Sequence, residues 1–383
     1  MNDLSVAALA EEAAERTGPW PAEVPFAGTL GLLVDSCLRT GNLNATGVQV
    51  LHRAAVRHLR NLRYLQDHVE AHPDILARPL VSPVVVTGLP RTGTTLLHNL
   101  LALDPDHRVL RFWEALHPVP PGGSGPDAEA LQAQAQRWLD AFHRLVPEFE
   151  AIHRATFDGP EECDALLQNS FASQHFDDMF DAHEYSDWLT TAPLIAEYEH
   201  YALQLRVLST ADATDTTTTR HRTWALKSPS HLGHLDALFA ALPGATVVMC
   251  HRHPRQAVAS YASLIAALRR AYSDTVSPEA IGRQALDRGA TAMQRALVAR
   301  DGAAVIDVSY EAMMGDPVGV VGAVYERLGR PYHPEEVARW AAAHPQHQHG
   351  PHRYDLARFG LTDDDVDRAF APYLERYGAL VGG

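Results

Sequence analysis

The stretch VVVTGLPRTGTTLLHNLL, residues 84–101, joins an apolar run, a glycine-rich turn and a second apolar segment. Its three successive valines are typical of a strand buried on both faces, which we place at Pro83–Thr87. A helix is expected at Leu96–Leu103, directly after the turn. Backbone N–H groups at the start of such a helix lack intrahelical partners and carry the positive end of the helix dipole. The stretch therefore predicts an anion site between strand and helix.

The residue types in the turn suit a phosphate group. Gly93 lets the backbone approach an anion closely, and Arg91 supplies a cation. Thr94 and Thr95 add hydroxyl donors. The spacing from Gly88 to Gly93 is that of nucleoside-triphosphate loops, but Thr94 stands where those loops carry lysine. An ordinary strand-to-helix turn is the alternative, and the coincidence of these residue types with a strand–turn–helix context favours the anion site.

Three further strands are expected along the chain, at Thr223–Leu226, Ala245–Cys250 and Ala303–Val308. Helical segments lie between them, for example Arg255–Ala271. Strands that alternate with helices indicate an α/β fold with a central parallel sheet flanked by helices on both faces.

The rest of the chain is predicted to be mainly helical. N-terminal helices are expected over residues 1–75, a helical region over about 110–220, and C-terminal helices over 330–383. The segments that form the expected anion sites are spread over residues 80–320. We therefore expect one domain spanning residues 1–383.

Composition limits the possible partners. The net charge of −15 gives no global positive field for nucleic acid. The three cysteines, Cys37, Cys163 and Cys250, form no CxxC pair, which favours a reducing compartment. The N-terminal residues do not have the pattern of a signal peptide, and no apolar run has membrane-spanning length. A soluble, cytoplasmic protein is expected.

A second anion site is predicted in ATVVMCHRHPRQAVASYASL, residues 245–264. Arg252 lies at the end of the expected strand, and Ser260 lies eight residues later in the following helix. An arginine fork and a hydroxyl can hold one phosphate dianion at several points. This pair is weak evidence by itself, because surface arginines are common, but it gains strength beside the first loop.

The segment PRTGTT, residues 90–95, resembles the 5′-phosphosulfate loop of the sulfotransferase superfamily that uses 3′-phosphoadenosine-5′-phosphosulfate (PAPS). Because it carries an arginine within the loop, the segment resembles the bacterial and tyrosyl-protein branches, whereas the cytosolic branch carries a lysine there. The resemblance implies a P-loop-like sulfotransferase fold and a 3′-phosphate site at Arg252 and Ser260. It also implies that the 5′-phosphosulfate is bound by Pro90, Arg91, Thr92, Gly93, Thr94 and Thr95.

Two more segments extend the resemblance over residues 80–320. WALKSPSHL, residues 224–232, resembles the strand end that carries an active-site lysine, here Lys227. VSYEAMMGDP, residues 308–317, resembles a late strand-and-loop block of the superfamily. Leu96 departs from the cytosolic enzymes, which usually carry there a tryptophan that stacks on the adenine.

The resemblance implies transfer of a sulfuryl group from PAPS to a hydroxyl by in-line displacement, with PAP as product and no metal. The acceptor oxygen must lose a proton while the departing phosphate gains charge, so a base and preorganised cations are needed. Arg91 and Lys227 are the expected cations. The base is expected to be Glu114, because the arginine-loop branch carries a glutamate at about this distance. Glu161, Glu162 and His231 stay open as alternatives.

The acceptor is expected to be a small molecule that carries a hydroxyl, and a carbohydrate or a protein tyrosine stays open as an alternative. Aromatic side chains are frequent between Trp113 and Trp188, and a subset of them would line a pocket for an apolar or aromatic alcohol. A lipid, a polyketide or a phenolic metabolite would suit them, and no feature of the sequence sets the oligomeric state. Two other functions stay open. A P-loop phosphotransferase would need a lysine after Gly93 and an acidic magnesium ligand, whereas His251 and Arg252 follow the strand at residues 245–250. A non-catalytic PAP-binding protein would bind the nucleotide without turnover.

Overall fold

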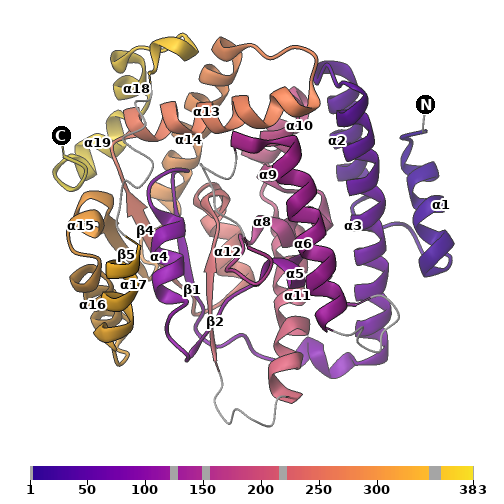
Figure 1. Cartoon of the computed structure of the whole chain (residues 1–383), viewed down its shortest axis with the longest axis horizontal. Coiled ribbons are helices and arrows are strands. Elements are labelled where there is room, and N and C mark those ends of the chain that lie inside the picture. The colour runs from indigo at the N-terminus through magenta and orange to yellow at the C-terminus, as the bar shows by residue number, and fades with distance from the viewer. Residues whose placement is uncertain (1–2, 121–127, 149–155, 215–221, 345–354, 383) are drawn as a thin grey trace. The chain divides into compact units, whose positions relative to one another are not determined.

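The computed structural model describes residues 3–120, 128–148, 156–214, 222–344 and 355–382 (Figure 1). Its sheet has five strands in the order β2-β3-β1-β4-β5, and each neighbouring pair is parallel. The strands are β1 (Val84–Gly88), β2 (His107–Arg108), β3 (Thr223–Lys227), β4 (Thr246–His251) and β5 (Val305–Ser309). The predicted α/β fold with a central parallel sheet is thereby confirmed.

The four predicted strands are present within two residues of their expected bounds. The edge strand β2 was not predicted. It consists of His107 and Arg108, which pair with Thr223 and Trp224 of β3. Two polar residues at a sheet edge have neither a β-branched run nor a period-2 pattern, so the sequence contains no signal for them.

The centre of the sheet aligns three strand ends. Every residue of β1 is buried, as expected for a strand with neighbours on both sides. Val86 of β1 is in register with Lys227 of β3, and Gly88 is in register with Cys250 of β4. Because the carboxyl ends of parallel strands meet at one edge, the turn after β1 lies beside the ends of β3 and β4.

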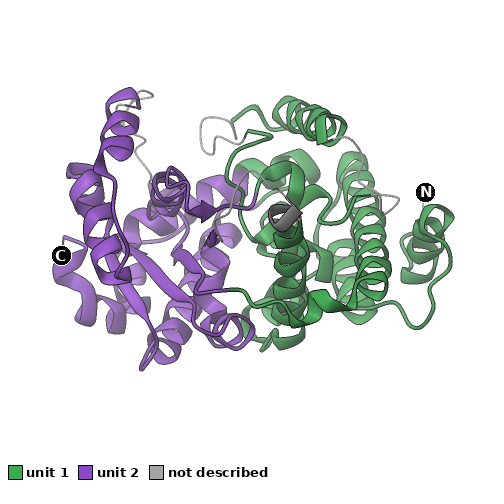
Figure 2. Ribbon diagram, turned by 90° about the horizontal axis from the view of Figure 1, so that it is seen from below, with its two compact units in different colours: residues 1–80, 111–219, 267–276 green, residues 81–110, 220–266, 277–383 purple. Residues whose placement is uncertain are grey.

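The chain divides into two compact units, coloured in Figure 2. Unit 1 comprises residues 1–80, 111–219 and 267–276, and unit 2 comprises residues 81–110, 220–266 and 277–383. The whole sheet belongs to unit 2. Two of the boundaries between the units lie between residues 110 and 111 and between residues 219 and 220. They coincide with the ends of the helical region that the sequence predicts over about residues 110–220. That the chain folds as one domain stays a prediction.

Unit 1 is helical in its described residues. Its longest helix, α3, buries Leu51, Ala55, Leu59 and Leu62 at helical spacing, as the sequence pattern predicts. Its elements are α1 (Val6–Thr17), α2 (Ala27–Thr40), α3 (Ala45–Ala71), η1 (Pro73–Ala77), α5 (Phe112–Leu116), α6 (Ala128–Leu145), α8 (Asp164–Leu167), η2 (Gln168–Ser170), α9 (Gln174–Met179), α10 (His183–Thr191) and α11 (Ile195–Thr214).

The helices of unit 2 surround the sheet. Leu97 of α4 and Val321 of α16 pack with Val84 and Val248 in one buried cluster. The elements are α4 (Thr94–Leu101), η3 (Pro229–His234), α12 (Leu235–Ala241), α13 (Pro254–Tyr272, which ends in unit 1), α14 (Pro278–Ala299), α15 (Tyr310–Gly315), α16 (Pro317–Leu328), α17 (Pro334–Ala343), η4 (Ala357–Phe359), α18 (Asp363–Ala369), α19 (Ala371–Tyr377) and η5 (Gly378–Leu380). Among the described residues, no helix combines the length and apolarity needed to cross a bilayer.

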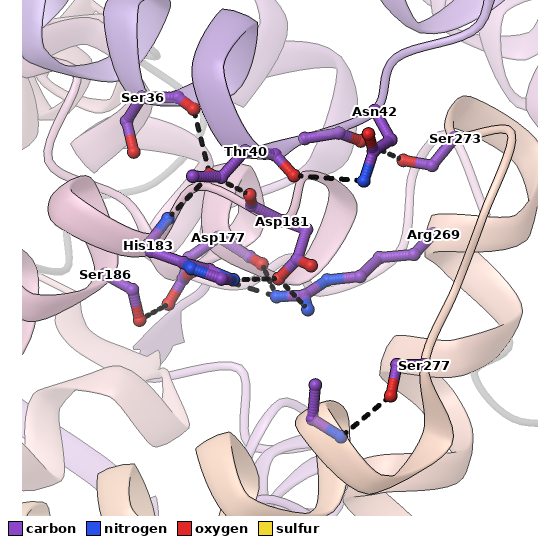
Figure 3. Close-up of polar contacts among 12 residues, drawn as sticks. Ser36, Thr40, Asn42, Asp177, Asp181, His183, Ser186, Arg269, Ser273 and Ser277 are labelled. Atoms are coloured by element: carbon purple, nitrogen blue, oxygen red, sulfur yellow. Dashed lines mark hydrogen bonds and ion pairs between the residues drawn. The ribbon is translucent and has the colours of Figure 1, made fainter.

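The short segment 267–276 is bound to the rest of unit 1 through the buried guanidinium of Arg269 (Figure 3). Arg269 pairs with the Asp181 carboxylate at 2.6 Å and donates to the Asp177 backbone oxygen at 2.8 Å. Ser273 donates to the Gly41 oxygen at 2.7 Å. The buried charge of Arg269 is compensated by these oxygens. Loss of Arg269 would in turn remove a compensating cation from Asp177, which is itself fully buried.

Candidate active site

The phosphate loop, residues 88–95, owes its shape to backbone angles that favour glycine. Gly88 and Gly93 have φ of 147° and 87°, and Arg91 between them has φ of 72°. A Cβ atom on Gly93 would lie 2.6 Å from the Met313 side chain and 2.8 Å from the Tyr310 ring. Only glycine fits this position, which is the N-cap of α4.

The threonines of the phosphate loop have different surroundings. Thr92 is buried and donates from Oγ1 to the Leu89 oxygen at 2.7 Å, so it braces the turn from inside. Thr94 and Thr95 are the first two residues of α4. Gly93 has no side chain with which to cap this helix, so the amides of its first turn are suited to an anion.

The two predicted anion sites contact each other. Arg91 donates from Nε to Ser260 Oγ on α13 at 3.1 Å. Arg252, which follows β4, donates from Nη1 to the backbone oxygen of Arg91 at 2.9 Å. The guanidinium of Arg252 lies 4.2 Å above the Tyr310 ring, a geometry that favours a cation–π interaction. Residues from both sequence segments thus form one polar cluster in unit 2.

Lys227 lies at the end of β3 and is only 1% exposed. Its Nζ donates to Thr95 Oγ1 at 3.3 Å. This contact places a buried cationic side chain beside the phosphate loop. Arg91 and Lys227 therefore bring cationic side chains to residues of the same loop.

Glu114 lies in α5 of unit 1 and is 7% exposed. Its Oε2 accepts a hydrogen bond from the Arg111 backbone N–H at 3.0 Å, so it caps the amino end of its own helix. The backbone N–H groups of Phe112 and Trp113 donate to the oxygens of Gly159 and Phe157. These bonds place the segment that contains Glu114 beside the segment that leads into Glu161.

Glu161 and Glu162 lie with a histidine that sequence reasoning missed. Glu161 Oε1 accepts from the Glu162 backbone N–H at 2.8 Å, and Glu162 Oε2 lies 3.7 Å from His175 Nε2. Burial opposes the charged imidazole, but the hydrogen bond to Glu162 and the carboxylates of Asp164, Glu162 and Glu161 outweigh it and raise the pKa of His175 to about 9. No motif links His175 to the acidic pair thirteen and fourteen residues earlier.

The same cluster has the geometry of a potential cation site. Ligand atoms of Glu162, Asp164 and His175 lie within 4.8 Å of one another. Carboxylate oxygen and imidazole nitrogen are ordinary ligands for divalent metals. A proton on His175 competes with such a metal, because the imidazole must be neutral to bind one.

His231, the fourth candidate base, is fully buried in η3, four residues after Lys227. It belongs to unit 2, whereas Glu114, Glu161 and Glu162 belong to unit 1. Leu96 is partly buried and packs against the core cluster that contains Val84 and Val248 of the sheet.

An ion network at His251, the residue before Arg252, was also missed from the sequence. Arg300 forms two hydrogen bonds of 2.8 Å with the Asp307 carboxylate, which also lies 2.8 Å from His251 Nε2. Burial opposes the carboxylate, but the hydrogen bonds from His251 and Arg300 outweigh it and lower the pKa of Asp307 to about 2. The network links β4 to β5 at His251, the residue before Arg252.

Comparison with known proteins gives a consistent result. The profile described as the sulfotransferase family matches residues 83–334. The structure is similar to sulfotransferase STF1 from Mycobacterium tuberculosis H37Rv, with 29% identity, a TM-score of 0.79 and coverage of 97% of this chain and 100% of that one. It is also similar to sulfotransferase STF9 from Mycobacterium avium, with 27% identity, a TM-score of 0.83 and coverage of 98% and 97%. Among curated proteins, no match was found.

Proposed function

Because this chain belongs to the sulfotransferase family, we propose that it transfers the sulfuryl group of PAPS to a hydroxyl of a small-molecule acceptor and releases PAP. The bond between sulfur and the phosphate oxygen breaks, and a bond between sulfur and the acceptor oxygen forms. The acceptor proton passes to a base. The observation that carries the proposal is the cluster of Arg91, Ser260 and Arg252, in which both predicted anion sites share hydrogen bonds.

The donor would be held at its two phosphate ends. The loop amides, Thr94, Thr95 and Lys227 would bind the 5′-phosphosulfate, and Arg252 with Ser260 would bind the 3′-phosphate. Arg91 Nε already lies 3.1 Å from Ser260 Oγ, so an incoming phosphate can gain both side chains with little rearrangement. No metal is required in this scheme, because side-chain cations and backbone amides would neutralise the leaving group.

Arg91 and Lys227 would stabilise the charge that develops on the departing phosphate. Glu114 would take the acceptor proton, with Glu161, Glu162 and His231 as the alternatives. Support for Glu114 comes from its burial and from its aromatic neighbours. In the present structure its Oε2 accepts from the Arg111 backbone N–H.

The acceptor would be an apolar or aromatic alcohol, such as a lipid, a polyketide or a phenolic metabolite. Aromatic rings gather around the helix that carries Glu114. The Phe112 ring lies 5.4 Å from the Trp138 ring, which stacks on Phe142 at 5.4 Å. Trp138 is 40% exposed, so part of this aromatic surface is open to a ligand.

Calorimetric titration with PAP tests the donor site. We expect Arg252→Ala to weaken PAP binding by about 1.5–3 kcal/mol, which is roughly ten- to a hundredfold in Kd. Arg255→Ala is the matched control, since Arg255 lies three residues later and pairs with Asp363 and Asp367 instead. Equal losses in both variants, or no PAP binding by the native protein, would overturn the proposal. Turnover is then measured with PAPS and a panel of phenols and long-chain alcohols.

A further inference from the structure

Arg57 of α3 is a partly buried cation that has no carboxylate partner among the described residues. Its Nη2 donates to His58 Nε2 at 3.0 Å. A guanidinium has five N–H groups, and within the described ranges this is the hydrogen bond that Arg57 makes. Burial lowers the pKa of Arg57 to about 10, so the side chain is still charged at pH 7. A charge in such a place is costly unless an anion joins it.

A series of hydrogen bonds orients this guanidinium. His58 Nδ1 lies 2.7 Å from Asn169 Oδ1, an acceptor, so the ring proton is assigned to Nδ1 and Nε2 accepts from Arg57. Asn169 in turn donates from Nδ2 to Gln204 Oε1 at 2.7 Å. Of the unpaired nitrogens of Arg57, Nε is covered by protein, whereas Nη1 is accessible. The oriented cation therefore presents Nη1 where an anion can reach it.

Arg57 lies near the end of the helix that carries Glu114. Asn61, one turn later on α3, donates from Nδ2 to the oxygen of Leu116, the last residue of α5, at 3.0 Å. Burial, and after it the charge of Arg57, lowers the pKa of His117, the C-cap residue of α5, to about 4. Glu114 precedes His117 by three residues. The uncompensated cation and the proposed base thus belong to neighbouring parts of unit 1.

The aromatic surface proposed for the acceptor adjoins the same place. Gln134 of α6 acts on His117 through a side-chain hydrogen bond, which opposes the fall of the His117 pKa. Trp138 follows Gln134 by one turn on α6, and its ring lies 5.4 Å from the Phe112 ring of α5. A ligand on these rings would have its apolar body against aromatic side chains and a negative group at Arg57.

Given the proposed transfer to a hydroxyl, on which this inference rests, we propose that Arg57 binds a carboxylate of the acceptor. The substrates would then be hydroxy acids with an apolar or aromatic body. A carboxylate carries the one negative charge that compensates a guanidinium, and its oxygens match the geometry of the N–H groups. A phosphate dianion would need further donors, because it brings twice the charge into the same surroundings.

Matched pairs of an acid and its methyl ester isolate the effect of the charge. The probes are 4-hydroxybenzoate and 6-hydroxy-2-naphthoate, each compared with its methyl ester by calorimetric titration of the full chain in the presence of PAP. We expect at least one acid to bind about ten- to a hundredfold more tightly than its ester, the usual effect of a charge-assisted hydrogen bond. No binding of either acid, or equal affinity of acid and ester in both pairs, would overturn the inference.

Variants assign the preference to Arg57. Arg57→Gln keeps a donor near His58 but removes the charge, so it should weaken the acid about ten- to a hundredfold and leave the ester unchanged. Arg57→Lys keeps the charge without the planar fork and should restore part of the preference. Arg63→Gln is the matched control, because Arg63 lies on the same helix and pairs with Asp67. Equal losses for acid and ester in Arg57→Gln would mean a structural role and would overturn the inference.

The native protein provides a readout that does not depend on variant folding. The guanidinium signals of Arg57 in ¹H–¹⁵N spectra report on its hydrogen bonding. Saturation with the acid should shift them, whereas the ester should shift them much less. Equal shifts with the two probes would show that the carboxylate does not reach Arg57.

Turnover separates this inference from the proposed function. With PAPS as donor, kcat/KM should be about ten- to a hundredfold higher for the acid than for its ester, and Arg57→Gln should remove the difference. Turnover of acid and ester at equal kcat/KM would leave sulfuryl transfer standing and overturn the role of Arg57. Binding of the acid that depends on Arg57, without turnover of any probe, would keep the anion site and refute its assignment to an acceptor.

Discussion

Arg91 donates a hydrogen bond from Nε to the hydroxyl of Ser260 across 3.1 Å, although 169 positions separate the two residues in sequence. The backbone of Arg91 has φ of 72°, and its oxygen accepts from Arg252 at 2.9 Å. A non-glycine residue in this conformation costs about 1–3 kcal/mol and persists where its surroundings hold it. Contacts at both its backbone and its side chain therefore prearrange Arg91 before any ligand arrives.

Arg91 and Ser260 should be energetically coupled in PAP binding. Because they are in direct contact, the effects of Arg91→Ala and Ser260→Ala should depart from additivity by about 0.5–3 kcal/mol in a double-mutant cycle. Calorimetric titration of the four proteins gives the coupling. Arg91→Ala combined with Arg255→Ala serves as the reference pair and should be additive within about 0.5 kcal/mol. If the effects on PAP binding were additive for both pairs of substitutions, the hydrogen bond between Arg91 and Ser260 would have no role in the nucleotide site.

Gly93→Ala should abolish PAP binding. The added Cβ meets Met313 and Tyr310 at 2.6 and 2.8 Å, and the residue must keep φ of 87°. Gly329→Ala is a matched control, because Gly329 has φ of 64° and open space around its Cβ position. The control should lose only about 1–2 kcal/mol of stability and should keep its PAP affinity. Comparable Kd values for the two variants would contradict the close packing described for the phosphate loop.

Lys227→Met should lower kcat by about 10²–10³, the usual effect of removing one donor to a developing charge. Methionine has a similar length, so the buried space stays filled. The measurement is kcat with PAPS and an accepted alcohol, alongside PAP affinity by calorimetry. Lys227 acts on the transferring group if kcat falls by much more than the affinity. A loss confined to PAP affinity would assign it to nucleotide binding alone.

Chelation should leave activity intact. Cations and amides from the protein would neutralise the leaving group, and no step in the proposed transfer uses a metal. Initial rates are compared before and after dialysis against EDTA, and again after addition of Mg²⁺ or Zn²⁺. The rate measured after addition of Zn²⁺ also shows whether a metal bound at the potential cation site affects activity. That site consists of Glu162, Asp164 and His175, whose ligand atoms lie within 4.8 Å of one another. Complete loss with EDTA and recovery with Mg²⁺ would refute the metal-free mechanism.

Stability should fall as pH rises from about 6.5 to 9. Folding raises the pKa of His175 from the usual 6.5 to about 9, so its stabilising effect is fully present below pH 6.5 and is lost as pH rises through 9. The full effect is at most about 3 kcal/mol. Thermal unfolding of the native protein and of His175→Gln between pH 6 and 9.5 measures it. The variant should show a flatter profile, and parallel profiles would locate the dependence elsewhere.

Much of the fold follows from local pattern. The valine run at 84–86 predicts a buried strand because a central parallel strand has covered faces, and β1 is indeed buried throughout. The strand β2 could not be predicted, because His107 and Arg108 are held there by pairing with β3 and not by their own preference. The division into two units also lacks a linker signal, because each unit is assembled from separate segments.

The sequence predicts the anion-binding residues of the candidate site better than it predicts the base. Parallel strands end at the phosphate loop, at Lys227 and just before Arg252. Because the carboxyl ends of parallel strands share one edge of the sheet, the topology predicts that these residues lie at the same edge. The base cannot be singled out in this way, because Glu114, Glu161 and Glu162 depend on helix packing in unit 1. The pairing of His251 with Asp307 joins residues 56 positions apart, and no short motif encodes it.

The ion pairs of Arg269 have a consequence for how the chain is made. Most of unit 1 precedes Arg269 in the chain, but Arg269 is synthesised 88 residues after Asp181, and residues 220–266 of unit 2 come between. At ordinary rates of translation this interval lasts roughly 5 to 20 seconds. Throughout it, Asp177 and Asp181 lack their cation. Unit 1 therefore cannot complete its interior until residues 267–276 have been translated.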